Sequence, residues 1–433
     1  MGKTIIIKNA WIIDPASSAK VNGDIFIRDG RIDTVHPGIA LPADVSIDAT
    51  GLFAAPGLVD MHVHTRDPGQ TYKDDILSVA ACAAAGGITS FVCMPNTLPP
   101  ADCVDVLQHI IEKARRAAVR VYPVAAVTKG LTGKELTDMQ TLRRAGAVAF
   151  SDDGNPVSDS AVLSAALKQS IESSSLILAH CEERKLSAGG LINEGKISEK
   201  LAVRGIPAAA ENEATVRDIQ LAAVIKARLH ICHVSTAGAV QAIKEAKKRG
   251  VKVTAETCPQ YFALDEELLL RRDADYRMNP PLRTPEDRMA IIEALTDGTI
   301  DCIATDHAPH TAEEKKNFLT APNGVVGLET SLGAGITYLV EKRYVTLEKL
   351  IFLMSTAPAR ILGIQGGTLA KGQPADIVLF DPSEKWRVEP EKLHGRCSNT
   401  PFKHLELSGR VKYTVCNGEI VFPLSERMAA DVP

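Results

Sequence analysis

The feature that most limits the fold of this chain is the pattern His62-Val63-His64, which follows the apolar run of residues 51–58. That run is typical of a buried strand. Side chains alternate along a strand, so His62 and His64 project to the same side of a sheet. A rigid strand can therefore hold two neutral imidazoles at the separation at which they bind a metal ion. Two surface or hydrogen-bonded histidines are the alternative, and the rest of the sequence has to decide between them.

A regular alternation of strands and helices extends over residues 57–365. Apolar strand segments are expected at residues 57–64, 90–94, 120–127, 147–150, 176–180, 229–234, 251–256 and 300–305. Segments with helical periodicity lie between them, including residues 73–85, 103–118, 211–227 and 237–249. Eight such units predict an α/β fold of the (β/α)8 TIM-barrel type. An open, doubly wound sheet has the same alternation, but the chain lacks that fold's Gly-x-Gly-x-x-Gly turn and phosphate loop.

The two ends of the chain share a different, antiparallel β pattern. Residues 1–56 contain short strands and a hairpin turn at Asp29-Gly30, and residues 366–433 contain strands and a turn at Asn417-Gly418. We expect the two ends to pair with each other and form one small β-sandwich domain beside the barrel of residues 57–365. The length of 433 residues suits such a division, because it exceeds the usual size of one hydrophobic core. The polar tail, residues 425–433, is expected to be frayed.

Composition and charge exclude several classes of partner. The net charge of −4 at pH 7 argues against a nucleic-acid or anionic-membrane partner. No apolar segment reaches the roughly 18 residues that span a bilayer, and the start of the chain lacks a signal-peptide pattern. The nine cysteines are scattered without a Cys-x-x-Cys pair, which is typical of reduced packing residues. We therefore expect a cytoplasmic protein.

Polar side chains recur where the barrel strands should end, which is where the reactive side chains of such barrels gather. The residues at these positions are His62, His64, Asn96, Asp152 or Asp153, His180, His233 and Asp306. A purely structural role does not explain four histidines and at least two aspartates at the carboxyl edge of one barrel, and these residues predict a metal site. One catalytic zinc ion uses about three protein ligands, so this number of ligands suggests two metal ions.

The chemistry expected of such a site is hydrolytic. Binding to a metal lowers the pKa of water towards about 7, so the site can hold a hydroxide near neutral pH. We expect that metal-bound hydroxide to be the nucleophile. Asp306, as the last ligand, can accept the proton of the attacking water and deliver it to a leaving nitrogen. Asp306 is therefore the candidate general acid and base.

Two assignments depend on which way a side chain points. Alternation along residues 229–234 places His230 and His233 on opposite faces, so we expect His233 to bind the metal and His230 to pack against helices. Asp152 and Asp153 are adjacent, so only one of them can easily face the metals, while the other can cap the following turn. Their positions alone leave that choice open.

Arg66 favours an anionic substrate, because a guanidinium binds a carboxylate through two hydrogen bonds. It lies on the same face as His64 if the strand continues. Further hydrogen bonds to substrate are expected from Asn96, Asn279 and His310. The segment around Asn323-Gly324 suits a flap over the site, and an ordinary surface loop is the alternative.

Four motifs resemble the long, bacterial-type (class I) dihydroorotases of the amidohydrolase superfamily. They are residues 62–70 (HVHTRDPGQ), 94–97 (MPNT), 151–154 (SDDG) and 306–310 (DHAPH), and the resemblance covers nearly the whole chain. It implies the reversible, zinc-dependent cyclisation of N-carbamoyl-L-aspartate to dihydroorotate, the third step of pyrimidine synthesis. It also implies two zinc ions per subunit, a homodimer and an association with aspartate carbamoyltransferase.

The resemblance assigns roles to individual residues. The implied metal ligands are His62, His64, Asp153, His180, His233 and Asp306, which selects Asp153 over Asp152. The implied substrate contacts are His64, Arg66, Asn96, Asn279, His310, Asn323 and Gly324, with Arg66, Asn96 and His310 placed for the substrate carboxylates. Thr65 and Asp67 depart from the family pattern, in which a larger apolar residue and a glutamate are expected.

Two alternatives remain. The related hydantoinases, dihydropyrimidinases and allantoinases bridge their metals with a carboxylated lysine on the fourth strand. Residues 147–154 contain no lysine, and we expect Lys129, the nearest candidate, to be structural. The other alternative is a non-catalytic partner of aspartate carbamoyltransferase. Such partners have lost ligand histidines, whereas this chain retains all four.

Overall fold

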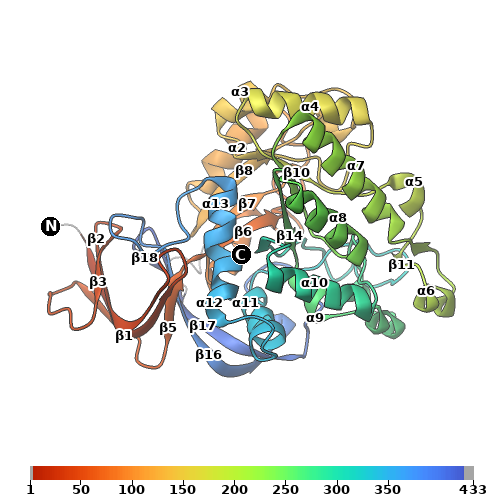
Figure 1. Ribbon diagram of the computed structural model, residues 1–433. Coiled ribbons are helices and arrows are strands. Elements are labelled where there is room, and N and C mark those ends of the chain that lie inside the picture. The colour runs from red at the N-terminus through yellow and green to blue at the C-terminus, as the bar shows by residue number, and fades with distance from the viewer. Residues whose placement is uncertain (1–2, 424–433) are drawn as a thin grey trace.

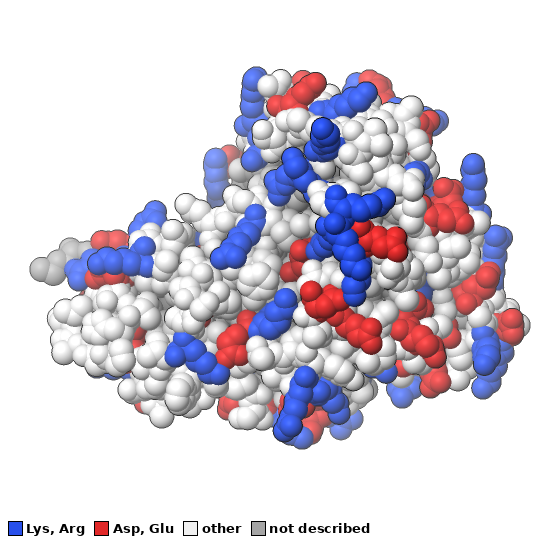
Figure 2. All heavy atoms as spheres, viewed as in Figure 1, with Lys and Arg blue, Asp and Glu red and all other residues white. Residues whose placement is uncertain are grey.

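The computed structural model describes residues 3–423, which form a parallel barrel surrounded by helices and a separate sheet built from both ends of the chain (Figure 1). The tail expected to be frayed lies outside the described residues. No helix within residues 3–423 is both long and apolar enough to cross a membrane. Figure 2 shows acidic and basic side chains interspersed over the visible face of the molecule.

Eight parallel strands form the barrel, and each overlaps one of the eight segments predicted from the sequence. In spatial order they are β6 (Leu58–Val63), β7 (Ile88–Cys93), β8 (Arg120–Ala125), β9 (Ala149–Phe150), β10 (Ile177–Ala179), β13 (Leu229–Ile231), β14 (Val253–Thr257) and β15 (Cys302–Ile303). A parallel bridge between Val63 and His307 joins the first strand to the segment after the last one. The predicted barrel is therefore confirmed.

Helices cover the outside of the barrel. The longer ones are α1 (Ile76–Ala85), α2 (Val104–Ala114), α3 (Met139–Ala145), α4 (Ser160–Glu172), α7 (Ala209–Ile225), α8 (Ala237–Lys248) and α10 (Pro285–Asp297). After β15 the chain forms α11 (Ser331–Gly335), α12 (Leu347–Ile351) and α13 (Ala357–Leu362), with π-helical turns at Ile336–Val340 and Phe352–Thr356. Short elements fill the loops at the carboxyl edge: α5 (Arg184–Ser187), α6 (Lys196–Leu201), α9 (Pro259–Ala263), β11 (Ile192–Asn193) and β12 (Gly205–Ile206).

The second sheet combines the two ends of the chain. Its strands are β1 (Thr4–Asp14), β2 (Ala19–Arg28), β3 (Arg31–His36), β4 (Val45–Asp48), β5 (Phe53–Pro56), β16 (Ile377–Arg387), β17 (Glu406–Cys416) and β18 (Glu419–Phe422). The order is β18-β17-β16-β5-β1-β2-β3, and β4 also pairs with β1. The two ends join where β5 runs antiparallel to β16, so the predicted pairing of the ends is confirmed. The eight strands form one connected sheet, because β1 pairs with β4 along its first half and with β5 along its second.

Both predicted hairpin turns are present. Asp29 and Gly30 have φ of 51° and 73°, and Asn417 and Gly418 have φ of 51° and 72°, which are the left-handed values of a two-residue type I′ turn. The two turns also pack against each other. A Cβ on Gly418 would lie 2.5 Å from the Cα of Gly30, so this close approach requires glycine.

Strand β16 connects the sheet to the barrel. Ile377 and Leu379 point into the apolar core shared with β1, β2 and β5, whereas Val378 and Phe380 point into the main core around the barrel helices. This follows from the two-residue repeat of a strand that is buried on both faces. The barrel is thereby held on one side by the sheet, and its carboxyl edge stays free for a site.

Candidate metal centre

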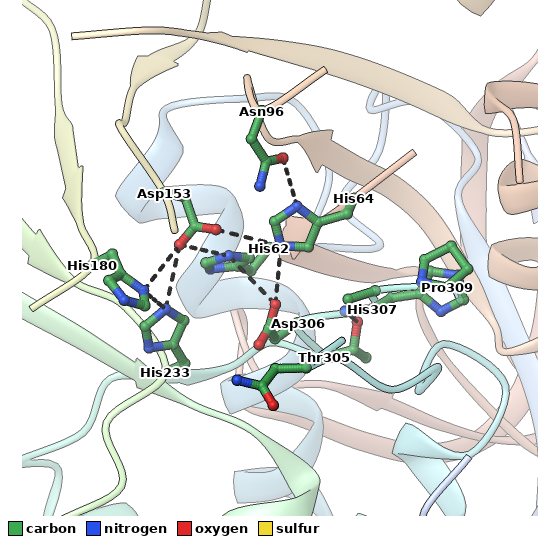
Figure 3. Close-up of polar contacts among 12 residues, drawn as sticks. His62, His64, Asn96, Asp153, His180, His233, Thr305, Asp306, His307 and Pro309 are labelled. Carbon is green, nitrogen blue, oxygen red and sulfur yellow. Dashed lines mark hydrogen bonds and ion pairs between the residues drawn. The ribbon is translucent and has the colours of Figure 1, made fainter. Parts of the chain in front are cut away.

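The six ligands predicted from the sequence come together at the carboxyl edge of the barrel, around the carboxylate of Asp153 (Figure 3). The Asp153 carboxylate oxygens lie 3.3 Å from His62 Nε2, 3.4 Å from His64 Nε2, 3.5 Å from His180 Nδ1 and 3.3 Å from His233 Nε2. Asp306 lies beside this group, with Oδ1 3.1 Å from His64 Nε2 and 3.6 Å from His62 Nε2.

The donor set fits divalent cations. Two groups of three ligand atoms share Asp153, one with His62 and His64 and the other with His180 and His233. His62 Nε2, which faces Asp153, is buried without a hydrogen-bond partner among residues 3–423, and such an atom needs an explanation in a folded protein. Imidazole nitrogens and carboxylate oxygens are ligands that zinc takes, and a carboxylate shared by two triads suits a bridge between two ions.

Three residues of the site have left-handed backbone conformations, with φ of 36° at His233, 51° at Asp306 and 60° at Arg66. These values are unfavourable for residues with a side chain, and they cluster at functional sites in proteins. Each of the three follows the end of a barrel strand. At His233 the turn redirects a side chain that regular alternation along β13 would point towards the helices.

The prediction for His230 was wrong. Its side chain lies inside the barrel, with Nδ1 2.8 Å from the Thr254 hydroxyl and Nε2 3.4 Å from Glu256. Leu229 and Ile231 are the residues of β13 that pack against the helices. Alternation holds only as far as the strand, and the left-handed turn at His233 then brings that side chain to the site.

Of the two adjacent aspartates, only Asp153 faces the histidines. Asp152 accepts hydrogen bonds from the backbone N–H of Val127 (2.8 Å) and Thr128 (3.0 Å), and from the Thr128 hydroxyl. It therefore fixes the chain that follows β8. Lys129 is exposed and pairs with Glu135, so it lies outside the site.

Two glutamates, the fully buried Glu256 and the half-buried Glu182, were missed by the sequence reasoning. Glu256 Oε1 lies 2.9 Å from His62 Nδ1, which directs the other imidazole nitrogen towards Asp153. Burial alone would raise the pKa of Glu256, but hydrogen bonds from His230 and His62 lower it to about 2. Glu182 Oε2 lies 3.4 Å from His180 Nε2, and its Oε1 accepts from Asn279 Nδ2 at 3.3 Å. Glu256 ends a predicted strand. The rule that polar residues at the carboxyl ends of barrel strands belong to the site, which selected the ligands, therefore applied to Glu256 as well.

An open cavity of about 210 Å³ lies over the cluster, and small-molecule sites in proteins are concave in this way. Its lining includes all but one of the predicted substrate contacts: His64, Arg66, Asn96, Asn279, Asn323 and Gly324. The exception, His310, lies directly behind the wall, with Nε2 2.9 Å from the Asn323 carbonyl oxygen and 3.2 Å from Arg66 Nη2.

The segment around Asn323-Gly324 is anchored by buried cations. The Lys315 ammonium donates to the carbonyl oxygens of Arg277, Pro322 and Gly324 at 2.8–3.2 Å. The Arg277 guanidinium donates to Asn323 Oδ1 at 3.1 Å. These contacts fix the backbone that closes one side of the cavity.

Comparison with known proteins places the chain among cyclic-amide hydrolases. Residues 51–239 match a family model described as dihydro-orotase-like, and residues 194–422 match a model described as amidohydrolase family. The chain is 45% identical over 421 residues to a dihydroorotase of Geobacter metallireducens, which covers 96% of this chain and 99% of that protein. It is 45% identical over 419 residues to a dihydroorotase of Acetivibrio thermocellus, covering 96% of this chain and 98% of that one.

Solved structures with a similar fold include two of other cyclic-amide hydrolases. The L-hydantoinase (dihydropyrimidinase) of Arthrobacter aurescens has a TM-score of 0.87 and 28% identity, covering 97% of this chain and 96% of its own. The dihydropyrimidinase of Brevibacillus agri has a TM-score of 0.83 and 27% identity, covering 96% and 95% of the two chains.

Proposed function

The chain belongs to the dihydroorotase family of the amidohydrolase superfamily and is a hydrolase of cyclic amides, and on that premise we propose that it interconverts N-carbamoyl-L-aspartate and (S)-dihydroorotate in pyrimidine biosynthesis. The observation that carries this proposal is the placement of Arg66 beside the histidine and aspartate cluster, in the wall of the same cavity. A guanidinium there provides a partner for the carboxylate that distinguishes dihydroorotate from uncharged cyclic amides.

The chain binds a metal cofactor, and we propose that it holds two zinc ions per subunit. The proposed ligands are His62, His64, Asp153, His180, His233 and Asp306, and the sharing of Asp153 by two ligand groups supports a bridging role. Zinc at these positions would activate a water molecule and polarise the ring carbonyl.

We propose Asp306 as the general acid and base. Burial would raise the pKa of its carboxyl, but the hydrogen bond from His64 and the nearby imidazoles lower it, so the group is ionised and can accept a proton. In hydrolysis it takes the proton of the water that adds to the ring carbonyl, and it gives that proton to the ring nitrogen as the carbon–nitrogen bond breaks. In cyclisation the same carboxyl runs these transfers in reverse.

The proposed substrate contacts surround this carboxylate. We propose that Arg66, Asn96 and His310 bind the substrate carboxylates, and that Asn279, His64, Asn323 and Gly324 complete the cavity wall. His64 Nδ1 lies 2.8 Å from Asn96 Oδ1, so the Asn96 side chain also orients the His64 ring.

A hydantoinase activity is the second candidate, because the solved structures reported above are hydantoinases and dihydropyrimidinases. The decisive experiment compares turnover of dihydroorotate and hydantoin by the zinc-loaded protein, with Asp306→Ala as control. Faster turnover of hydantoin would favour the hydantoinase. Turnover of neither substrate with zinc bound would favour a non-catalytic partner of aspartate carbamoyltransferase.

We also propose the domain limits, assembly and location that the sequence suggests. The barrel domain would comprise residues 57–365, and residues 1–56 and 366–433 would form the second domain. We propose a homodimer, an association with aspartate carbamoyltransferase and a cytoplasmic location. All nine cysteines are unpaired and eight of them are buried, which supports a reducing compartment. Sedimentation of the purified protein, alone and with the transcarbamoylase, tests both associations.

A further inference from the structure

Lys73 is a buried lysine beside the substrate cavity that none of the roles above explains. It lies between β6 and α1 and is 6% exposed. Its Nζ lies 2.9 Å from Glu314 Oε1 and 3.2 Å from His310 Nδ1. Removing an ammonium from water is unfavourable, so a lysine in this position needs partners that use its charge or its hydrogens.

The contacts of His310 fix the position of its proton. An ammonium can only donate a hydrogen bond, so His310 Nδ1 accepts from Lys73 and carries no hydrogen. A carbonyl oxygen can only accept, so Nε2 donates to the Asn323 oxygen at 2.9 Å and carries the hydrogen. Both neighbours therefore select the same neutral tautomer, and Glu314 Oε2, at 3.6 Å from Nδ1, lies beyond hydrogen-bond distance.

The second proton is kept off His310 by its surroundings. Burial, followed by the charges of Arg66, Lys73 and Lys315, lowers the pKa of His310 to about 3, and Glu314 opposes that shift. The ring is therefore neutral at physiological pH. It has one donor, at Nε2, on the side of the cavity.

The Nε2–H donor of His310 faces a second donor, the Arg66 guanidinium. Arg66 Nη2 lies 3.2 Å from His310 Nε2, and two donors do not hydrogen-bond to each other. Gly324 lines the cavity at this point, and a Cβ there would lie 3.0 Å from the same Nε2. An anionic oxygen placed beside both groups would accept from each of them, and a carboxylate provides two such oxygens.

Building on the proposed function, we infer that Lys73 is a positioning residue that helps to hold His310 in the Nε2–H tautomer, so that the single Nε2 hydrogen is shared between the Asn323 carbonyl oxygen and a substrate carboxylate bound by Arg66. Without Lys73, the Glu314 carboxylate, whose Oε2 lies 3.6 Å from Nδ1, competes for the hydrogen, and Nε2 then presents a lone pair to the anion. Lys73 thereby contributes to the selection of a carboxylate-bearing cyclic amide over an uncharged one.

A purely structural role makes a different prediction. The Lys73–Glu314 ion pair also fixes the turn in which Glu314 accepts from the Thr311 backbone N–H at 3.0 Å. If Lys73 only held that turn, Glu314→Gln would have the same effect as Lys73→Met. Under our inference Glu314→Gln keeps the contact between Lys73 and His310, so it leaves substrate selection nearly unchanged.

The test compares zinc-loaded Lys73→Met with the parent protein. Loss of a charge-assisted contact predicts a rise in KM for dihydroorotate of about tenfold or more. KM for uncharged 5,6-dihydrouracil and the zinc content should stay unchanged. The matched control is Lys113→Met, which removes a lysine paired with Asp67 at 2.5 Å that makes no contact with His310. An equal change in KM for both substrates would overturn the inference.

The 15N chemical shifts of the His310 ring provide a readout that does not depend on turnover. The parent should show hydrogen on Nε2, and Lys73→Met should show a shift of population towards Nδ1. Hydrogen on Nδ1 in the parent would overturn the inference even if Lys73→Met does not fold. Failure of the parent to turn over dihydroorotate, with the population shift in Lys73→Met observed, would refute the proposed function while supporting the role of Lys73.

Discussion

Replacing Glu256 with glutamine should weaken zinc binding without creating a cavity in the barrel core. Glu256 is fully buried, and its two oxygens contact His62 Nδ1 at 2.9 Å and His230 Nε2 at 3.4 Å. The amide keeps the shape of the side chain but loses its charge, so the hydrogen bond to His62 is no longer charge-assisted. Such bonds contribute about 1.5–3 kcal/mol, and loss of a carboxylate behind a ligating histidine lowers metal affinity about 10–100-fold.

The assay is competition for zinc with a chromophoric chelator, which reports affinity independently of turnover. Asp376→Asn is the matched control, because Asp376 is equally buried, accepts from the Asn417 backbone N–H at 2.9 Å and pairs with Arg120, all outside the site. That change should lower the free energy of unfolding and leave zinc affinity unchanged. Equal zinc affinities for Glu256→Gln and the parent would refute the reasoning that Glu256 orients His62.

Three further predictions test the bridging role of Asp153, the close packing of Gly418 and the His394–Glu329 pair. Asp153→Asn should reduce zinc content by more than the loss of one ion, because both ligand groups share this carboxylate. Elemental analysis measures the zinc content, and loss of a single ion would contradict the bridging role. Gly418→Ala should lower the free energy of unfolding by more than about 1 kcal/mol, because φ is +72° and the Cβ would lie 2.5 Å from Gly30 Cα. Gly38→Ala, at φ +74° with nothing within 4 Å of the Cβ, is its control in denaturant titrations, and equal losses would exclude the contact as the cause. The hydrogen bond to Glu329 raises the pKa of His394, so this pair stabilises the fold below the ordinary histidine pKa, and that contribution is lost as pH rises through the raised value. His394→Gln should abolish this part of the pH dependence of unfolding, and an unchanged profile would show that the pair contributes nothing.

The barrel could be predicted because its strands are local features of the sequence. A parallel strand buried on both faces is a short apolar run, and each of the eight runs overlaps a strand of the structure. The predicted ligands follow from the same property, since His62, Asp153 and Asp306 stand at or just after a strand end. The pairing of β5 with β16 joins segments more than 300 residues apart, and only their shared antiparallel pattern indicated it.

The errors and omissions concern properties that depend on three-dimensional surroundings. The direction of His230 could not be read from alternation, because the left-handed turn at His233 lies outside the strand. The strand-end position of Glu256 was visible in the sequence, but its contact with His62, like that of Lys73 with His310, depends on burial, and both residue types are usually exposed. A charged residue that is paired inside the protein has the same appearance in a sequence as one on the surface.

The site has two halves of different chemistry, and this division bears on how a substrate is oriented. Carboxylates at Asp153, Asp306 and Glu182 surround the histidines, where cations would bind. Arg66 lines the cavity beside His310, and Lys73, paired with Glu314, contacts the same ring. The proposed substrate has two corresponding ends, because its carboxylate is anionic and its ring amide is neutral. Turned end for end, the substrate would leave the Arg66 guanidinium without a carboxylate partner. The Arg66 contact thus favours the orientation that brings the ring carbonyl and nitrogen to Asp306, and the carboxylate contacts act on catalysis by positioning the amide as well as on binding.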